Sequence, residues 1–204
     1  TAGTMVVNKL RPRLDDDWQI TVVDANETHH YQPGYLFIPF GIYSRNDIVK
    51  SRRDFVPAGV EFVLGDIDIV EPEANRVKLM DGTTLDYDYL VIATGPRLAF
   101  EEVEGSGPNG GHTHSICTID HAENAYQDYL KLLEAPGHVV IGAMPFASCF
   151  GPAYEYAFIL DADLRKRKMR DRVPMTFVTS EPYIGHLGLG GVGVGIDVIG
   201  GGDD

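Results

Sequence analysis

The chain has 204 residues, of which 44% are hydrophobic and 23% charged, so it can bury one large core or two small ones and does not have the composition of a disordered chain. Its formal net charge of −13 excludes binding to nucleic acid through phosphates, because counterion release needs clustered Lys and Arg. Two cysteines are too few for a disulfide scaffold, so each is either a packing residue or a redox residue.

The first part of the sequence alternates helical and strand patterns. A helix is expected from Ala2 to about Leu14, with Val6, Val7 and Leu10 facing inward. After it we expect a strand over 20–24, a loop over 28–43, a short helix over 46–54 capped by Asn46, and a strand over 60–64.

A small antiparallel meander follows, with strands expected over 67–71, 76–80 and 83–85. Its turn is Asp81-Gly82, which is a strong hairpin signal. The apolar run over 89–93 is typical of a buried parallel strand.

A second unit begins after residues 101–111, which are acidic, rich in Gly, Ser and Pro, and expected to form a linker. Its expected elements are a helix over 119–134, a strand over 138–141, a loop over 142–151, a helix over 153–170 and a strand over 175–179. The fold class is therefore α/β, with two Rossmann-like units. The predicted domains are 1–104 and 105–193, and the glycine-rich tail 194–204 is unassigned.

The first unit carries features of dinucleotide binding. Such a unit runs from a strand through G-x-G-x-x-G into a helix, and then to a second strand that ends in an acid about 20 residues beyond the glycines. Asp24 ends the strand over 20–24, and Gly3 has the separation of the last glycine. The first strand and earlier glycines would then precede Thr1, so we expect the fold to be incomplete at this end. The irregular tail suggests the same at the other end.

Gly95, without a Cβ, would let the backbone pass close to a flavin nucleotide.

Three runs are more specific: SICTIDHA over 115–122, ASCFGPAYE over 147–155 and SEPYIGHL over 180–187. Together with the FAD-type features, these runs resemble the sulfide:quinone oxidoreductases, FAD enzymes with two dinucleotide-binding domains. The resemblance spans residues 1 to about 192. It implies that FAD is bound by Gly3, Asp24, Ala25, Gln32, Pro33, Asp66, Ile67, Ala93, Thr94 and Gly95.

The second unit departs from an NAD-binding turn. After the strand over 138–141, the middle glycine of G-x-G-x-x-G is replaced by Met144, and Pro145 follows it. Proline also removes a backbone N–H donor. The phosphate cradle is therefore poor, which favours a thiol or sulfide over NAD(P)H as the electron donor.

The two cysteines are the main candidates for chemistry. Cys149 lies just before the helix expected from about Ala153, and a helix N-terminus favours the thiolate form. The resemblance implies that Cys149 pairs with a cysteine of the C-terminal half, absent from this sequence, and that sulfide opens this bridge to give a persulfide. For Cys117 it implies sulfur release or the holding of a sulfur species, and covalent attachment of FAD stays open. No cysteine lies in 31–40, which argues against the flavocytochrome sulfide dehydrogenases.

By resemblance, Glu155, His121 and His186 are candidates to move protons of hydrogen sulfide. Each could equally be a polar residue without a chemical role, whose hydrogen bonds are made within the fold. A zinc site of Cys117, His121 and Cys149 does not have the spacing of structural zinc motifs, so no metal is expected.

The expected function is FAD-dependent oxidation of sulfide to sulfane sulfur or polysulfide, with a quinone as acceptor. The alternatives are an enzyme like the type II NADH:quinone dehydrogenases, or an inactive piece of the fold. The expected partners are hydrogen sulfide, a quinone and a membrane surface contacted through the absent C-terminal half, with an oligomer possible. No apolar run approaches ~18 residues and no basic-then-apolar leader opens the sequence, so we expect neither a transmembrane helix nor a signal peptide here.

Overall fold

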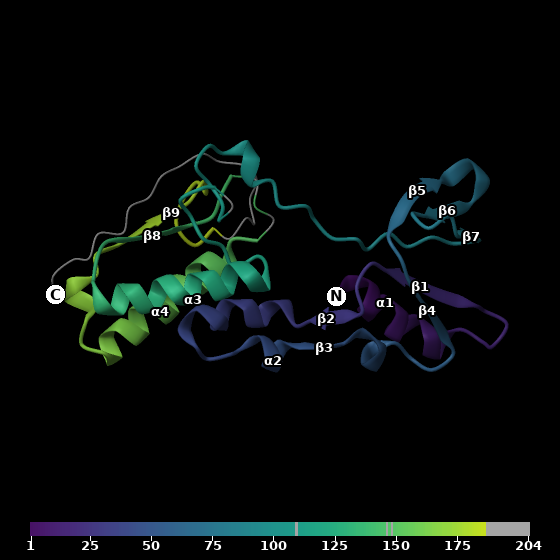
Figure 1. Ribbon diagram of the computed structural model, residues 1–204, viewed down its shortest axis with the longest axis horizontal. Helices are drawn as coiled ribbons and strands as arrows, with labels where there is room; N and C mark the ends of the chain where they lie inside the picture. Colours follow the sequence, from purple (N-terminus) through teal and green to yellow (C-terminus); the bar gives the residue numbers. More distant parts are fainter. Residues whose placement is uncertain (109, 146, 148, 187–204) are drawn as a thin grey trace. The chain divides into compact units, whose positions relative to one another are not determined.

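The computed structural model describes residues 1–108, 110–145, 147 and 149–186 (Figure 1). The chain divides into two compact units. The first holds Thr1–Gly34 and Ser44–Glu104, and the second holds Tyr35–Tyr43 together with the described residues from Gly105 onward. The predicted domain limit at 193 and the tail 194–204 lie outside the described residues.

The first unit is built on one parallel strand pair. β1 (Ile20–Asp24) and β4 (Val60–Leu64) lie in register, with Ile20 opposite Val60 and Asp24 opposite Leu64. Both strands confirm the prediction. Asp24 therefore stands at the carboxyl end of a parallel pair, which is the edge where open α/β sheets bind their ligands.

The opening helix is shorter than expected. α1 spans Ala2–Leu10 and continues as a 3-10 turn, η1 (Arg11–Arg13), because Pro12 cannot donate the hydrogen bond that an α-helix would require. Val7 is buried, as predicted, and Val6 is partly buried. Leu10 was wrongly expected to face inward: it is exposed at the end of the helix.

Residues 28–54, which we expected to form a loop and one helix, contain more elements than that. β2 (Thr28–His30) pairs antiparallel with β3 (Val49–Ser51). Between them the chain forms two helical pieces, and a third follows β3: η2 (Gln32–Phe40), α2 (Arg45–Ile48) and η3 (Arg52–Phe55). The helix cap is Ser44 and not Asn46, because the Ser44 backbone N–H donates to Asp47 in a capping box. The helix stops where Val49 pairs with His30.

The meander forms as predicted. Its strands are β5 (Ile67–Glu71), β6 (Arg76–Leu79) and β7 (Thr84–Asp86), in the antiparallel order β5-β6-β7. A short turn, η4 (Pro72–Ala74), joins the first two strands. Gly82 has a φ of +89° in the hairpin turn, a backbone region that favours glycine.

The prediction of a buried parallel strand over 89–93 is wrong. These residues adopt no strand, and Tyr89, Val91 and Ile92 are exposed. A strand needs a neighbour to complete its hydrogen bonds. In the described part of the chain β1 pairs with β4, and no strand lies beside 89–93. The short turn η5 (Phe100–Glu102) follows before the second unit begins.

The second unit is a βαβ arrangement with an added helix. β8 (Val139–Gly142) and β9 (Met175–Val178) pair in parallel, and α4 (Gly151–Lys166) with η6 (Arg170–Arg172) connects them. α3 (Ile119–Glu134) lies beside α4, as Figure 1 shows, and the Tyr129 hydroxyl of α3 donates to Asp163 of α4. The predicted βαβ order is confirmed.

The core of this unit is a set of apolar side chains from both helices, both strands and the end of η6: Tyr129, Ile141, Leu160, Leu164, Val173 and Phe177. Phe40 packs against it, with ring centroids 5.5 Å from Tyr129 and 4.9 Å from Tyr156. These aromatic contacts explain why Tyr35–Tyr43 groups with the second unit. Among the described residues, no helix has the length and apolar character needed to cross a membrane.

Candidate functional site

Asp24 is fixed at the end of β1 by three contacts. Its Oδ1 accepts the Asn26 backbone N–H at 2.9 Å, its carbonyl accepts the Gly65 N–H at 3.0 Å, and its Oδ2 lies 3.2 Å from the Arg52 guanidinium. The side chain keeps 28% of its exposure. An accessible carboxylate at the end of a parallel strand fits the acid that accepts a ribose hydroxyl in dinucleotide-binding units.

The other predicted cofactor residues lie in the first unit, Gly3 in α1, Gln32 and Pro33 in η2, Ile67 at the start of β5 and the rest in loops. Gly3 is close to one of them, since a Cβ added to Gly3 would lie 3.4 Å from the Ala93 Cβ. Gly95 has a φ of +80° and open space where a side chain would be, so its backbone is accessible from that side. The remaining predicted residues are exposed: Ala25, Gln32, Pro33, Asp66, Ile67, Ala93 and Thr94. The structure thus brings Gly3 to Ala93 and Asp24 to Gly65, next to Asp66.

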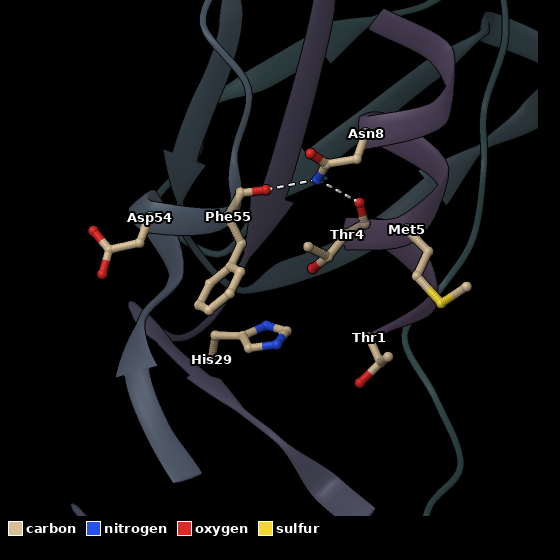
Figure 2. A pocket seen from close by; sticks show the side chains of 7 residues that line it. All are labelled: Thr1, Thr4, Met5, Asn8, His29, Asp54 and Phe55. Atoms are coloured by element: carbon tan, nitrogen blue, oxygen red, sulfur yellow. Dashed lines mark hydrogen bonds between the residues drawn. The ribbon is translucent and has the colours of Figure 1, made fainter. Parts of the chain in front are cut away.

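A pocket that the sequence analysis did not predict lies beside α1 (Figure 2). It has a volume of about 350 Å³ and is lined by Thr1, Thr4, Met5, Asn8, His29, Asp54 and Phe55. The Asn8 amide donates to the Thr4 carbonyl at 2.9 Å and to the Phe55 carbonyl at 2.7 Å, which ties α1 to η3. The His29 ring stacks on Phe55 with centroids 4.3 Å apart, and burial lowers the pKa of His29, with Arg52 adding to the effect.

Cys117 and His121 are linked through one hydroxyl. The Cys117 backbone N–H donates to Ser115 Oγ at 3.3 Å, and the same Oγ lies 2.7 Å from His121 Nδ1. Thr118, the N-cap of α3, accepts the His121 backbone N–H at 3.3 Å. Burial lowers the pKa of His121 and nearby His114 lowers it further, while Asp120 opposes them.

Cys149 lies directly before the N-cap of α4, which is Phe150. A Cβ added to Gly151, the first residue of the helix, would lie 3.8 Å from Cys149 Sγ. The helix begins two residues earlier than expected, with Pro152 in its first turn, where a missing N–H costs nothing. The sulfur is exposed and free.

The two cysteines share one local position. Cys117 precedes the N-cap Thr118 of α3, and Cys149 precedes the N-cap Phe150 of α4. Both thiols are exposed and neither forms a disulfide in this chain. Each cysteine therefore stands directly before the first turn of a helix.

The predicted proton-moving residues have different surroundings. Glu155 is exposed on α4, and no described residue forms a hydrogen bond or ion pair with it. His186 is buried, packs edge-on against Tyr183 with centroids 4.8 Å apart, and has no hydrogen-bond partner for its buried Nδ1 within the described chain. In the same part of the chain, no three His, Cys, Asp or Glu side chains gather as metal ligands would.

A buried polar network that the sequence did not predict lies between α4 and the chain after β9. Glu181, with 2% of its surface exposed, accepts from the Tyr154 hydroxyl at 2.5 Å and from the Thr179 hydroxyl at 2.8 Å. The Tyr154 oxygen in turn accepts the Gly185 backbone N–H at 2.9 Å. Two of these hydrogen bonds, both made by the Tyr154 hydroxyl, thus hold the turn before His186 against the first turn of α4.

Comparison with known proteins agrees with these observations. The chain is 42% identical over 181 residues to the sulfide-quinone reductase of Aquifex aeolicus, and 34% identical over 179 residues to the mitochondrial sulfide:quinone oxidoreductase of Dictyostelium discoideum. These matches cover 88% and 86% of this chain, but 41% and 39% of those proteins. The crystal structure of the Aquifex aeolicus sulfide:quinone oxidoreductase matches with a TM-score of 0.76 and 39% identity, over 92% of this chain and 42% of that one. No protein-family model matches.

The fold matches that of flavoproteins with two dinucleotide-binding domains. Within that class the chain is a homologue of the sulfide:quinone oxidoreductases, which confirms the resemblance read from the three sequence runs. The chain spans about two-fifths of the length of these curated relatives.

Proposed function

We propose that the protein containing this chain oxidises sulfide to sulfane sulfur through Cys149 and passes the electrons by way of FAD to a quinone. The observation that supports this most is the pair of exposed cysteines, each directly before a helix N-cap. The names of the homologues, which act on sulfide and quinone, support the same substrates.

The proposed chemistry begins with a hydrosulfide ion that attacks a disulfide of Cys149. A new bond forms between the incoming sulfur and Cys149 Sγ, and the partner sulfur leaves as a thiolate. A second hydrosulfide then takes the outer sulfur away as HS₂⁻, which leaves two reduced cysteines. When their disulfide re-forms, one proton and two electrons are released, so that two HS⁻ give HS₂⁻, H⁺ and two electrons.

FAD fits the first unit in this proposal. Asp24 would accept a ribose hydroxyl, and Gly3 would lie at the helix end that receives the pyrophosphate. Ala25, Asp66, Ile67 and the Ala93–Gly95 segment would contact the nucleotide along exposed backbone, with Gln32 and Pro33 as further contacts. When bound, FAD accepts the two electrons together, which single cysteines cannot pass to a quinone themselves.

The remaining candidates divide the supporting roles. Cys117 would hold or release the sulfane sulfur, and Glu155, His121 and His186 would move protons. The quinone would bring the full-length polypeptide to a membrane surface, since its apolar tail partitions into lipid. Co-sedimentation of that polypeptide with lipid vesicles tests the membrane contact, and recovery of all the protein in the supernatant would refute it.

The role of Cys149 is tested by Cys149→Ala in the full-length, FAD-bound protein. Under anaerobic conditions sulfide should bleach the ~450 nm flavin band of the wild type and leave that of the variant intact. Phe158→Ala is the matched control, because Phe158 is 72% exposed on α4, the helix that follows Cys149, and its substitution should leave bleaching unchanged. Wild-type bleaching in the Cys149 variant, with FAD still bound, would remove this mechanism.

The alternative donor, NADH, is disfavoured by the turn after β8. Gly142 is required there for packing between strands, since an added Cβ would lie 2.4 Å from the Val178 carbonyl oxygen. Met144 and Pro145 follow where an NAD-binding turn presents glycine N–H groups to the pyrophosphate. Gly142 is thus needed for strand packing, and the later glycines that would bind the phosphates are missing from this turn.

A further inference from the structure

We infer that Arg52 is a positioning residue for FAD, which holds the carboxylate of Asp24 in the orientation that accepts a ribose hydroxyl. Asp24 has that contact in the proposed function, on which this inference rests. Arg52 itself lies outside the three sequence runs and is not one of the predicted cofactor residues.

The side chain of Arg52 is bound by the turn that joins β1 to β2, and only 14% of it is exposed. Its Nε donates to the Asn26 carbonyl at 3.1 Å, and its Nη2 donates to the Thr28 carbonyl at 2.8 Å. The same Nη2 lies 3.2 Å from Asp24 Oδ2. The Arg52 backbone N–H also donates, to the Glu27 carbonyl at 2.7 Å. One guanidinium thus faces an oxygen of every second residue from Asp24 to Thr28.

The carboxylate of Asp24 is held from two sides as a result. Oδ1 accepts the Asn26 backbone N–H at 2.9 Å, while Oδ2 faces Arg52. The last torsion of an aspartate side chain is loosely restricted, so the second contact is needed to fix the plane of the carboxylate. An ionised carboxylate has about four lone-pair sites, so these two contacts leave room for a hydroxyl donor.

This arrangement lowers the cost of binding the nucleotide. The Asp24 side chain keeps 28% of its exposure, so a ribose hydroxyl can reach it. Because Arg52 orders the side chain before FAD arrives, binding does not have to restrain it. The planar fork of an arginine suits this task, since it can bind several oxygens at once in a fixed geometry.

The next residue in the chain, Arg53, provides a matched comparison. Its side chain is 60% exposed and lies 3.5 Å from Glu27, which is 58% exposed. Its guanidinium lies over the Phe62 ring, 5.1 Å from the centroid. Arg53 therefore carries the same charge as Arg52 but faces Glu27 and Phe62, and an exposed ion pair of this kind contributes little.

A double-mutant cycle on FAD binding tests the inference. Full-length protein freed of flavin is titrated with FAD, and Kd is measured from the change in flavin fluorescence. Asp24→Asn should raise Kd by about tenfold or more, because a hydrogen bond to a charged group is lost. Arg52→Gln should raise Kd by roughly fivefold when Asp24 is present. In the Asp24→Asn background the same change should raise Kd by less than about twofold, because Arg52 then has no carboxylate to position.

Two further variants separate positioning from charge and from folding. Arg53→Gln removes the same charge and should leave Kd unchanged. Arg52→Lys keeps the charge without the planar fork, should show the same dependence on Asp24, and serves if thermal unfolding shows that Arg52→Gln is not folded.

An unchanged Kd in Arg52→Gln, an equal increase in both backgrounds, or an equal increase in Arg53→Gln would each overturn the inference and leave the ribose contact of Asp24 standing. An unchanged Kd in Asp24→Asn would refute that contact, and the role of Arg52 with it. Sulfide-driven bleaching reports on the sulfur chemistry separately, so the two claims can fail independently.

Discussion

Single hydroxyl groups organise the polar interior of the second unit. Ser115 joins a cysteine backbone to a histidine ring, and Tyr154 joins a buried carboxylate to the backbone of Gly185. The Tyr154 oxygen donates to Glu181 and accepts the Gly185 N–H, and the Ser115 oxygen accepts the Cys117 N–H and contacts His121 Nδ1. The removal of such an oxygen takes a hydrogen bond from more than one group.

Tyr154→Phe is expected to destabilise the second unit by about 1–3 kcal/mol, because Glu181 loses a hydrogen bond while it stays buried. Tyr156→Phe is the matched control on the same helix. Burial raises the pKa of Tyr156 to about 12, but its hydroxyl has no hydrogen-bond partner in the described residues, so its loss should cost no more than about 0.5 kcal/mol. Urea denaturation measures the loss of stability in each variant, and an equal loss in the two would contradict the stabilising role of the network.

The sequence could offer candidate site residues but not their contacts with one another. Asp24, Cys117 and Cys149 could be named as candidates because each stands at a fixed place relative to a local element or motif. The Tyr154–Glu181 contact joins residues 27 positions apart, and only the packing of α4 against the chain after β9 brings them together. The pocket beside α1 likewise depends on contacts between Asn8 and Phe55, which are 47 positions apart.

At the scale of elements, the sequence predicted correctly those that local interactions determine and failed for those that need a partner far along the chain. α3, the meander and the βαβ order were predictable because periodicity and turn residues fix them locally. The run over 89–93 has the composition of a buried strand, yet it is exposed, because a strand is completed by a neighbour that composition does not reveal. The split of 46–54 into α2, β3 and η3 has the same origin, since β3 exists through its pairing with β2.

An ion-pair cluster ties the end of α4 to η6 and makes a pH-dependent prediction. Asp161 accepts from Arg165 at 2.7 Å and from Arg170 at 2.6 Å, and these hydrogen bonds lower the pKa of Asp161 below its ordinary value of 3.8. A lowered pKa in the folded state gives stability that is present above about pH 4 and is lost as the pH falls below that value.

Asp161→Asn should therefore lower the free energy of unfolding at pH 7 by no more than about 1 kcal/mol, because solvent screens the cluster. The variant should also lose less stability than the wild type as the pH falls below about 4. Thermal unfolding at a series of pH values would measure this. Asp171→Asn, one residue after Arg170, changes a carboxylate without a hydrogen bond in the described chain and serves as the control. An acid transition that is the same in Asp161→Asn and in the wild type would contradict this account.

At the scale of the whole molecule, the α/β class and the family were both predictable from the sequence. The sequence did not reveal that Tyr35–Tyr43 packs with the second unit, since this depends on the aromatic contacts of Phe40. The match covers about two-fifths of the length of these homologues.

The choice of electron donor tests the central claim most directly. The full-length, FAD-bound protein should be mixed without oxygen with sulfide in one experiment and with NADH in another, while the ~450 nm flavin band is followed. Sulfide should bleach the band within a turnover, and NADH should not, because the turn after β8 lacks the glycines that would hold its pyrophosphate. Bleaching by NADH with none by sulfide would contradict the account and point to the dehydrogenase alternative.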